Sequence, residues 1–174
     1  MYTKQEMDMS NSNIANIQDL PYPGSPSQSA ANTQGPRNPV GVMTRQDGNI
    51  FRYVYLNTAT SQATVAGAPC YFTGYSGASG TYTVSANVSD SAANLFAGVF
   101  LASGLTNQTY IFVQIAGYNP ALVVSGSPGA GAQFVASTSA TLTPMGLAED
   151  HLPVAIALAA ESGGTAPGII LAIQ

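Results

Sequence analysis

The side chain best suited to acid–base chemistry or metal binding is His151, which stands in AEDHLP beside Glu149 and Asp150. This grouping could supply a general base or part of a metal site. It is the only histidine, however, and no second ligand follows at metal-binding spacing. An acidic turn facing solvent is the favoured interpretation, and we expect neither a metal nor a cofactor.

Cys70, the only cysteine, lies in the apolar run APCYFT. That setting is typical of a buried small hydrophobe and not of an activated thiolate. A single cysteine excludes an intrachain disulfide, and no CxxC or Cys/His cluster suggests zinc. Nothing in the sequence brings Cys70 and His151 together as a nucleophile and base. We therefore expect no catalytic residue and no enzymatic activity.

Arg52 is the single cation between Arg45 and the C-terminus. Its guanidinium could pair with Asp47 or Asp90, or project to a carboxylate on a partner chain, while its stem packs over neighbouring aromatic rings. Both alternatives stay open at the level of sequence. Gly-rich stretches such as SGSPGAGAQ and GYSGASG lack the lysine of a P-loop and the spacing of a dinucleotide fingerprint, so they are interpreted as turns.

Composition points to a surface that meets other proteins. Only 7% of the 174 residues are charged, against roughly 25% in ordinary globular domains. A neutral surface more often faces another protein than open solvent. The net charge of −4 has the wrong sign for a nucleic acid partner. The N-terminus lacks the features of a secretory signal, and no run of apolar residues is long enough for a membrane span, so we expect a cytoplasmic origin and no membrane partner.

The chain divides into two parts of different composition. Residues 1–40 are rich in Ser, Asn, Gln and Pro, which is typical of an extended arm without a core of its own. A short helix over Ser12–Leu20 is possible, because Ile14, Ile17 and Leu20 share one face and Pro21 would end it.

Residues 41–174 alternate short β-branched or aromatic runs with Gly, Ser, Asn and Pro, which predicts an all-β domain. The small β-barrel, the jelly roll and the β-sandwich all fit this pattern. The expected strands are Ile50–Leu56, Ala68–Thr73, Thr81–Ala86, Ala97–Ala102, Tyr110–Ala116, Ala121–Val124, Gln133–Ala136, Val154–Ala159 and Gly168–Ile173.

An internal repeat emerges when residues 50–116 are compared with residues 119–174. AGAPCYFT aligns with AGAQFVAS, TYTVSA with ATLTPM, FAGVFLAS with LPVAIALAA, and TNQTYIFVQI with GTAPGIILAI, in the same order. The repeat makes FRYVYLN the opening strand of the first half and NPALVV that of the second. The aromatic residues of FRYVYLN then supply bulk to a core otherwise rich in Gly and Ala.

The segments GNIFRYVYLN, TVAGAPCYF and LFAGVFLAS, with YIFVQIAGYNPALV after them, resemble the small capsid decoration (cement) proteins of tailed bacteriophages. The likeness covers roughly residues 41–125, and the second half more weakly. The arm and the repeated second half depart from the simple family pattern. The resemblance implies a virion protein without an enzyme site, assembled in the bacterial cytoplasm as a homodimer or homotrimer on the outer surface formed by the major capsid protein.

The arm is expected to act as a strap along other subunits. Ordering forty residues costs on the order of 40–80 kcal/mol in backbone entropy, more than its few apolar side chains can offset against one small β domain. The expected partner-binding residues in the arm and the first strand are Tyr2, Ile14, Ile17, Leu20, Tyr22, Arg37 and Arg52. The alternative function is a head fibre or receptor-binding module, in which exposed tyrosines such as Tyr75, Tyr82 and Tyr118 bind host-surface glycans.

Overall fold

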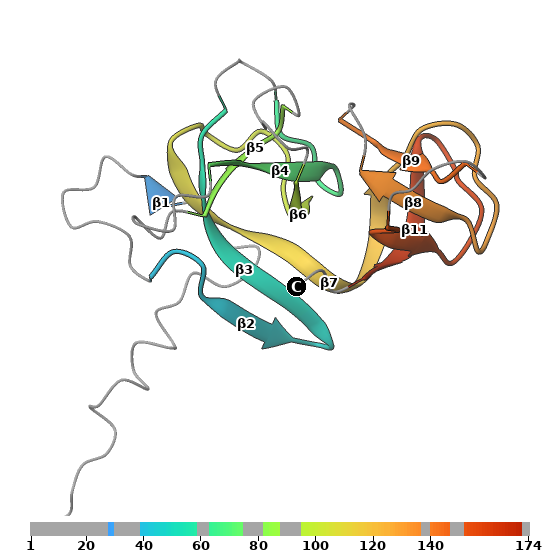
Figure 1. The fold of residues 1–174 in the computed structure, drawn as a ribbon, viewed down its shortest axis with the longest axis horizontal. Helices are drawn as coiled ribbons and strands as arrows, with labels where there is room; N and C mark the ends of the chain where they lie inside the picture. The colour runs from blue at the N-terminus through green and yellow to red at the C-terminus, as the bar shows by residue number, and fades with distance from the viewer. Residues whose placement is uncertain are drawn as a thin grey trace, which may run out of the picture.

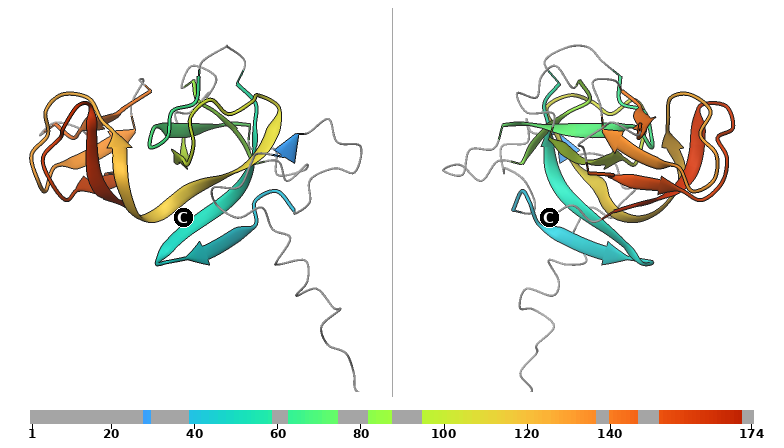
Figure 2. Two further views of the ribbon diagram at one scale, coloured as in Figure 1. Left: turned by 180° about the vertical axis from the view of Figure 1, so that it is seen from behind. Right: turned by 45° about the vertical axis from the view of Figure 1, so that its right-hand side comes forward.

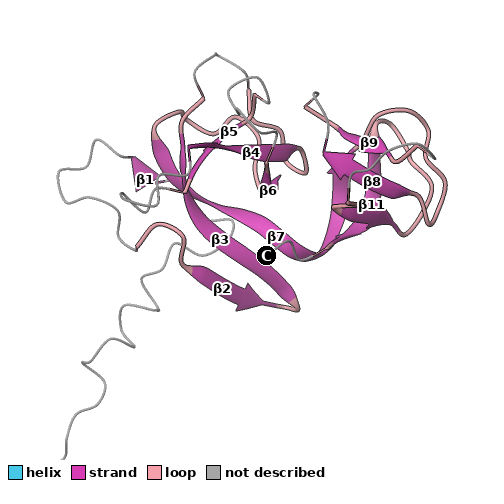
Figure 3. Cartoon of the chain, in the orientation of Figure 1, coloured by secondary structure: helices cyan, strands magenta, loops and turns pink. Residues whose placement is uncertain are grey.

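The computed structural model describes residues 28–29, 39–58, 63–74, 82–87, 95–136, 140–146 and 152–171. Every regular element in these ranges is a β-strand, which confirms the predicted all-β class (Figure 1 and Figure 3). The strands are β1 (Gln28–Ser29), β2 (Met43–Gln46), β3 (Asn49–Leu56), β4 (Pro69–Gly74), β5 (Thr83–Ser85), β6 (Phe96–Phe100), β7 (Thr109–Val123), β8 (Gln133–Ala136), β9 (Leu142–Pro144), β10 (Ala155–Ala157) and β11 (Thr165–Ile170).

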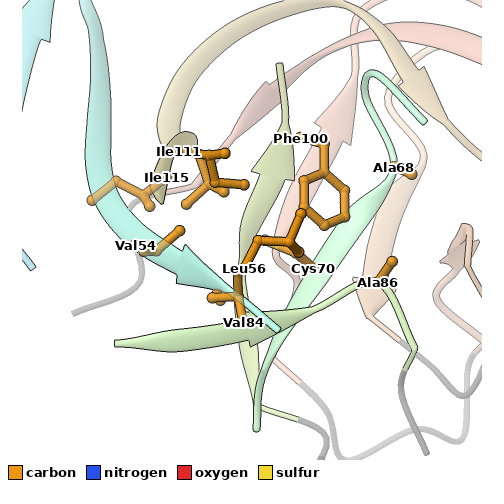
Figure 4. Close-up of a cluster of buried hydrophobic side chains, with 11 residues drawn as sticks. Val54, Leu56, Ala68, Cys70, Val84, Ala86, Phe100, Ile111 and Ile115 are labelled. Atoms are coloured by element: carbon orange, nitrogen blue, oxygen red, sulfur yellow. The ribbon is translucent and has the colours of Figure 1, made fainter. Parts of the chain in front are cut away.

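Five strands form a closed ring, which we call the first barrel. β3 pairs with β5, β5 with β4, β4 with β6, β6 with β7, and β7 returns to β3. Only the β3–β5 pair is parallel, with Leu56 opposite Val84. Alternate residues of these strands point inward, as period-2 strands require. The interior residues labelled in Figure 4 are Val54, Leu56, Ala68, Cys70, Val84, Ala86, Phe100, Ile111 and Ile115.

Strands β8 to β11 form a second ring, the second barrel, with the C-terminal part of β7. β7 pairs with β11, β11 with β10, β10 with β8, and β8 with β9. A parallel bridge between Val124 and Leu142 closes it. Its buried cluster contains Leu122, Val124, Phe134, Leu142, Val154, Ala155, Ala157, Ala166 and Ile170, together with Val99 of β6.

The two barrels repeat the same pairing order and the same strand directions, so the expected repeat has a structural counterpart. Backbone hydrogen bonds repeat as well. The Gly67 N–H donates to the Phe100 carbonyl at 2.8 Å, and the Gly131 N–H donates to the Ala157 carbonyl at 2.9 Å. In the same way, the Asn57 N–H donates to the Val84 carbonyl and the Ser125 N–H donates to the Leu142 carbonyl, both at 2.9 Å.

The structural equivalence corrects two of the sequence alignments. AGAPCYFT and AGAQFVAS align as expected, but Val84 is equivalent to Leu142, one residue away from the alignment of TYTVSA with ATLTPM. Val113 is equivalent to Gly168, which shifts the last strand by three residues. A one-residue shift in register exchanges the two faces of a strand. Strand pairing and burial therefore determine this register, whereas the Gly/Ala-rich sequence does not.

β7 is one strand of 15 residues, although the sequence predicted two separate strands, Tyr110–Ala116 and Ala121–Val124. It is the last strand of the first barrel and the opening strand of the second, and Figure 2 shows it curving from one set of strands into the other. Gly117 has φ +99° at the bend, a conformation that glycine adopts readily. Pairing therefore continues through Gly117 and Pro120, which had been interpreted as punctuation.

Two buried amides hold this bend. The Asn119 side-chain amide donates to Gln114 Oε1 at 2.9 Å, and Gln114 Nε2 donates to the Tyr118 carbonyl at 2.9 Å. The Ala121 N–H donates to Asn119 Oδ1, also at 2.9 Å. Since buried polar groups that are fully bonded specify one arrangement, this network fixes how β7 enters the second barrel.

Three further differences concern strand limits. The sequence did not predict β2, which forms a hairpin with β3 through Asp47 and Gly48, both at positive φ. The residues of β9 appeared only in the repeat alignment and not among the expected strands. The start of β11 was predicted at Gly168 and lies at Thr165.

Within the arm, Gln28–Ser29 pairs with Tyr110 and Thr109 of the same chain. The expectation that the arm lies along other subunits is therefore wrong for this pair of residues. The expected helix over Ser12–Leu20 lies outside the described residues.

Candidate interaction surfaces

Arg52 lies on β3, between Met43 of β2 and Val113 of β7. Its guanidinium carbon stands 5.2 Å from the ring centroid of Tyr82, in cation–π geometry. One terminal nitrogen donates to the Met43 sulfur at 3.7 Å, a weak contact. The Nε atom is buried and has no acceptor. The guanidinium is thus held in place with unused donor capacity.

Tyr82 is positioned by the segments around it. Its ring lies 6.0 Å from the Phe72 ring at 57°, and a Cβ atom added to Gly41 would collide with it. Gly41 in turn donates its N–H to the Tyr53 carbonyl at 2.7 Å. The platform under Arg52 is therefore fixed by β3, β4 and the turn before β2. The sequence predicted that the stem of Arg52 packs over aromatic rings, and the structure shows its guanidinium over one such ring.

Charge in the described ranges is concentrated near Arg52. Arg45, Asp47 and Arg52 all lie on the β2–β3 hairpin, and Glu161 is the fourth charged residue of these ranges. No ion pair joins Arg52 to a carboxylate in the part of the chain that the structure describes, and Asp47 sits at the hairpin turn. Asp90, the other expected partner, lies outside these residues. Pairing with a carboxylate on another chain therefore stays a prediction.

The other expected partner-binding residues, Tyr2, Ile14, Ile17, Leu20, Tyr22 and Arg37, also lie outside the described residues, as do His151 and Tyr75. The structure therefore brings none of them to Arg52. Among the described residues, no group of three or more His, Cys, Asp or Glu side chains is placed to bind a metal ion. The same residues contain no helix with the length and apolar character of a membrane span.

Cys70 is fully buried on β4 inside the first barrel. Burial raises the pKa of its thiol far above the ordinary value. Burial also raises the pKa of the neighbouring Tyr71 phenol, and the nearby Cys70 adds to this effect. Both groups stay protonated at neutral pH, so Cys70 behaves as a small apolar side chain and not as a nucleophile.

The aromatic residues of β3 lie on the outer side of the first barrel. Tyr53, with no exposed surface, packs 5.1 Å from Phe112 and 5.9 Å from Tyr110 between ring centroids, and Tyr55 lies 5.2 Å from Tyr110. Phe51 joins the same cluster. This cluster gives the first barrel a packed outer side, which is a framework role.

The second barrel exposes a row of apolar side chains, of which the sequence analysis singled out only Tyr118. Tyr118 of β7 pairs with Ile169 of β11, which pairs with Ile156 of β10. Tyr118 is 48% exposed, and Leu158, directly after β10, is 53% exposed. The alternating pattern of LPVAIAL is typical of a strand with one face toward solvent, but it did not show which of its residues lie on that face.

Compared with models of known protein families and with curated protein sequences, the chain shows no significant match. The functional argument therefore rests on these surfaces.

Proposed function

We propose that this chain is a structural virion protein that binds the outer surface of a bacteriophage capsid and stabilises contacts between major capsid protein subunits. The resemblance noted in the sequence supports this proposal. Its segments correspond to the framework of the first barrel: GNIFRYVYLN to β3 and its turn, TVAGAPCYF to β4, and LFAGVFLAS with YIFVQIAGYNPALV to β6 and β7. Assembly in the host cytoplasm and a virion location belong to the same proposal.

The observation that carries the proposal is the distribution of charge and apolar surface. Three of the four charged residues in the described ranges lie on one hairpin, while most of the exposed large apolar side chains lie outside it. These exposed side chains are Met43, Val65, Leu95, Tyr118, Met145, Leu152 and Leu158. Neutral surface can be covered by a partner without the cost of desolvating charges, which suits permanent attachment to a protein shell.

Arg52 supplies a directional contact within this otherwise neutral surface. Its guanidinium is held by Met43 and Tyr82. A carboxylate of the capsid subunit could accept from this side chain in a charge-assisted hydrogen bond, which is stronger than a neutral one. Little side-chain freedom remains to be lost on binding, because the guanidinium is already positioned.

The test is co-sedimentation of the purified chain with shells assembled from the major capsid protein of the same phage. We expect saturable binding, weakened by Arg52→Ala and unchanged by Arg45→Ala, which removes an exposed charge from the same hairpin. Shells that sediment without the protein would contradict the proposal. Equal loss of binding in both variants would leave capsid attachment standing but contradict the role of Arg52.

The second candidate function, glycan binding by a head fibre or receptor-binding module, is favoured by a single observation. Tyr118 exposes 48% of its surface and could stack against a sugar ring. Binding of host-surface polysaccharide by the wild type, lost in Tyr118→Ala, would support it against attachment to the capsid shell.

A further inference from the structure

The two barrels carry equivalent rows of side chains on their outer faces. In the first barrel, Phe51 pairs with Gln114, Gln114 with Val99, and Val99 with Pro69. In the second barrel, the corresponding row runs through Tyr118, Ile169, Ile156 and Gln133. Each row crosses four strands at the same positions of the repeat, so their surroundings can be compared directly.

The first row is buried and the second is not. Val99 has no exposed surface, and Gln114 is 2% exposed. At the equivalent positions of the second barrel, Ile156 and Ile169 are only half-buried, while Tyr118 and Gln133 are exposed. Leu158, equivalent to the half-buried Leu101, is exposed beside this row.

The second barrel is what covers the centre of the first row. Val99 belongs to the same buried cluster as Leu122 and Phe134, and Gln114 is bonded to Asn119. The adjoining turn is covered too: the Gly67 carbonyl accepts the N–H of residue 123 at 3.0 Å.

The equivalent turn of the second barrel is open. A Cβ atom on Gly67 would collide with the carbonyl of Ala121, whereas one on Gly131 would meet nothing within 4 Å. The uncovered region of the second barrel is therefore a continuous face made of the row and this turn, which we call the open face.

We propose that the open face is covered by the open face of a second copy of this chain. The equivalent face of the first barrel packs against the second barrel, which is built from the same repeat. A face of this kind can therefore be covered by a surface of the same repeat. The stretch of β7 that provides this cover is already used within each copy. The equivalent stretch around Tyr53 is bonded to Gly41 and Val42 at 2.7 and 2.9 Å. A neighbouring copy can therefore offer neither its β7 stretch nor its stretch around Tyr53 as a cover. The remaining contact joins two open faces, and such a contact is two-fold and closes at a dimer.

Charge is consistent with self-association at this face. The chain carries a net charge of −4, so two copies repel each other through any charged surface they bring together. The four residues of the open row are uncharged. Glu161, the one charged residue in the described part of the second barrel, accepts a hydrogen bond from the Gly164 N–H of its own loop. Two open faces can thus meet without placing like charges opposite each other.

The test is sedimentation of the full chain over a range of concentrations, which does not depend on the capsid proposal. We expect a dimer, with the dissociation constant raised at least about tenfold by Tyr118→Glu and by Leu158→Glu. Leu95→Glu is the matched control, because Leu95 is 51% exposed on the first barrel, and it should leave the dimer unchanged. Circular dichroism would establish that each variant is folded. A monomer at every concentration, or an oligomer that resists both substitutions, would overturn the proposal.

Discussion

Cys70 and Phe134 occupy equivalent positions in the two barrels, Cys70 opposite Gly98 and Phe134 opposite Ala155. Both are completely buried. A small side chain in one barrel thus corresponds to a large one in the other, and a second position reverses the difference. Phe100 in the first barrel is equivalent to Ala157 in the second. Each interior therefore contains one aromatic ring from these two positions. In the first barrel it is Phe100 of β6 (Figure 4), and in the second it is Phe134 of β8.

This exchange predicts compensation between two substitutions. Phe134→Cys leaves a cavity in the second barrel and should lower the free energy of unfolding by about 3–5 kcal/mol. Ala157→Phe alone overpacks the same interior and should cost about 1–3 kcal/mol. The double variant recreates the arrangement of the first barrel, so its loss should be smaller than the sum of the two, as measured by a double-mutant cycle in urea. Strict additivity would contradict the structural equivalence of the barrels.

Stability should fall at alkaline pH because of Cys70. Burial raises the pKa of its thiol in the folded state, while the unfolded thiol titrates near its ordinary value of about 8.5. Below that pH both states keep the proton and the full stability is present. Above it the unfolded state loses the proton first, so unfolding becomes easier by up to about 1.4 kcal/mol per pH unit.

Urea unfolding of the wild type and Cys70→Val at several pH values from neutral upward measures this effect. Cys70→Val should lack the decline in the free energy of unfolding that begins near the pKa of the thiol in the unfolded state. Tyr71→Phe is the informative companion, since the unfolded phenol titrates only near pH ~10 and the onset of the decline should not move. Identical pH profiles for wild type and Cys70→Val would show that the thiol is not responsible.

Gly67 and Gly131 provide a matched pair that reports on the contact between barrels. Their φ angles are +79° and +82°, so alanine at either position carries a strain of about 1–2 kcal/mol. Only at Gly67 would the new methyl group also collide with the Ala121 carbonyl, which should add about 1–3 kcal/mol. Thermal or urea unfolding of Gly67→Ala and Gly131→Ala measures the difference. Equal losses would mean that the second barrel does not press on the turn at Gly67.

Two truncations separate the arm from its short strand. Removing residues 1–26 keeps β1, and removing residues 1–38 also frees the edge of β7 at Thr109 and Tyr110. Both truncated chains should keep their strand content by circular dichroism, because both barrels are built from residues after Pro39. If the arm is the strap that the sequence predicts, both should lose occupancy in the shell co-sedimentation assay. Full occupancy without residues 1–26 would contradict the strap, whatever the longer truncation does.

Much of the fold could be predicted because strand signals here are local. Phe51 to Leu56 alternates inward and outward side chains, and Gln133–Ala136 was predicted with its observed limits. The Asp47–Gly48 turn, a strong hairpin signal, could have revealed β2. The continuity of β7 could not be predicted from local signals, since it depends on partners on both sides and on the Gln114–Asn119 bonds across the bend.

The surfaces were less predictable than the strands. Arg52 was singled out as conspicuous, yet its neighbour Tyr82, just before β5, is distant from it in sequence. The open face of the second barrel could not be inferred from composition, because each row contains one glutamine among apolar or aromatic residues and only the row of the first barrel is covered. Tertiary contact, and not residue type, decides which of the two rows is exposed.

Under the proposed function, cryo-electron microscopy of the phage particle to which this chain would belong tests the central claim most directly. The proposal predicts density for pairs of chains on the outer capsid surface, fitted by the described ranges within residues 39–171. In this density the β2–β3 hairpin lies against the major capsid protein. A particle whose outer shell carries no such density, or one in which the chain projects as a fibre touching the shell at one end, would contradict it.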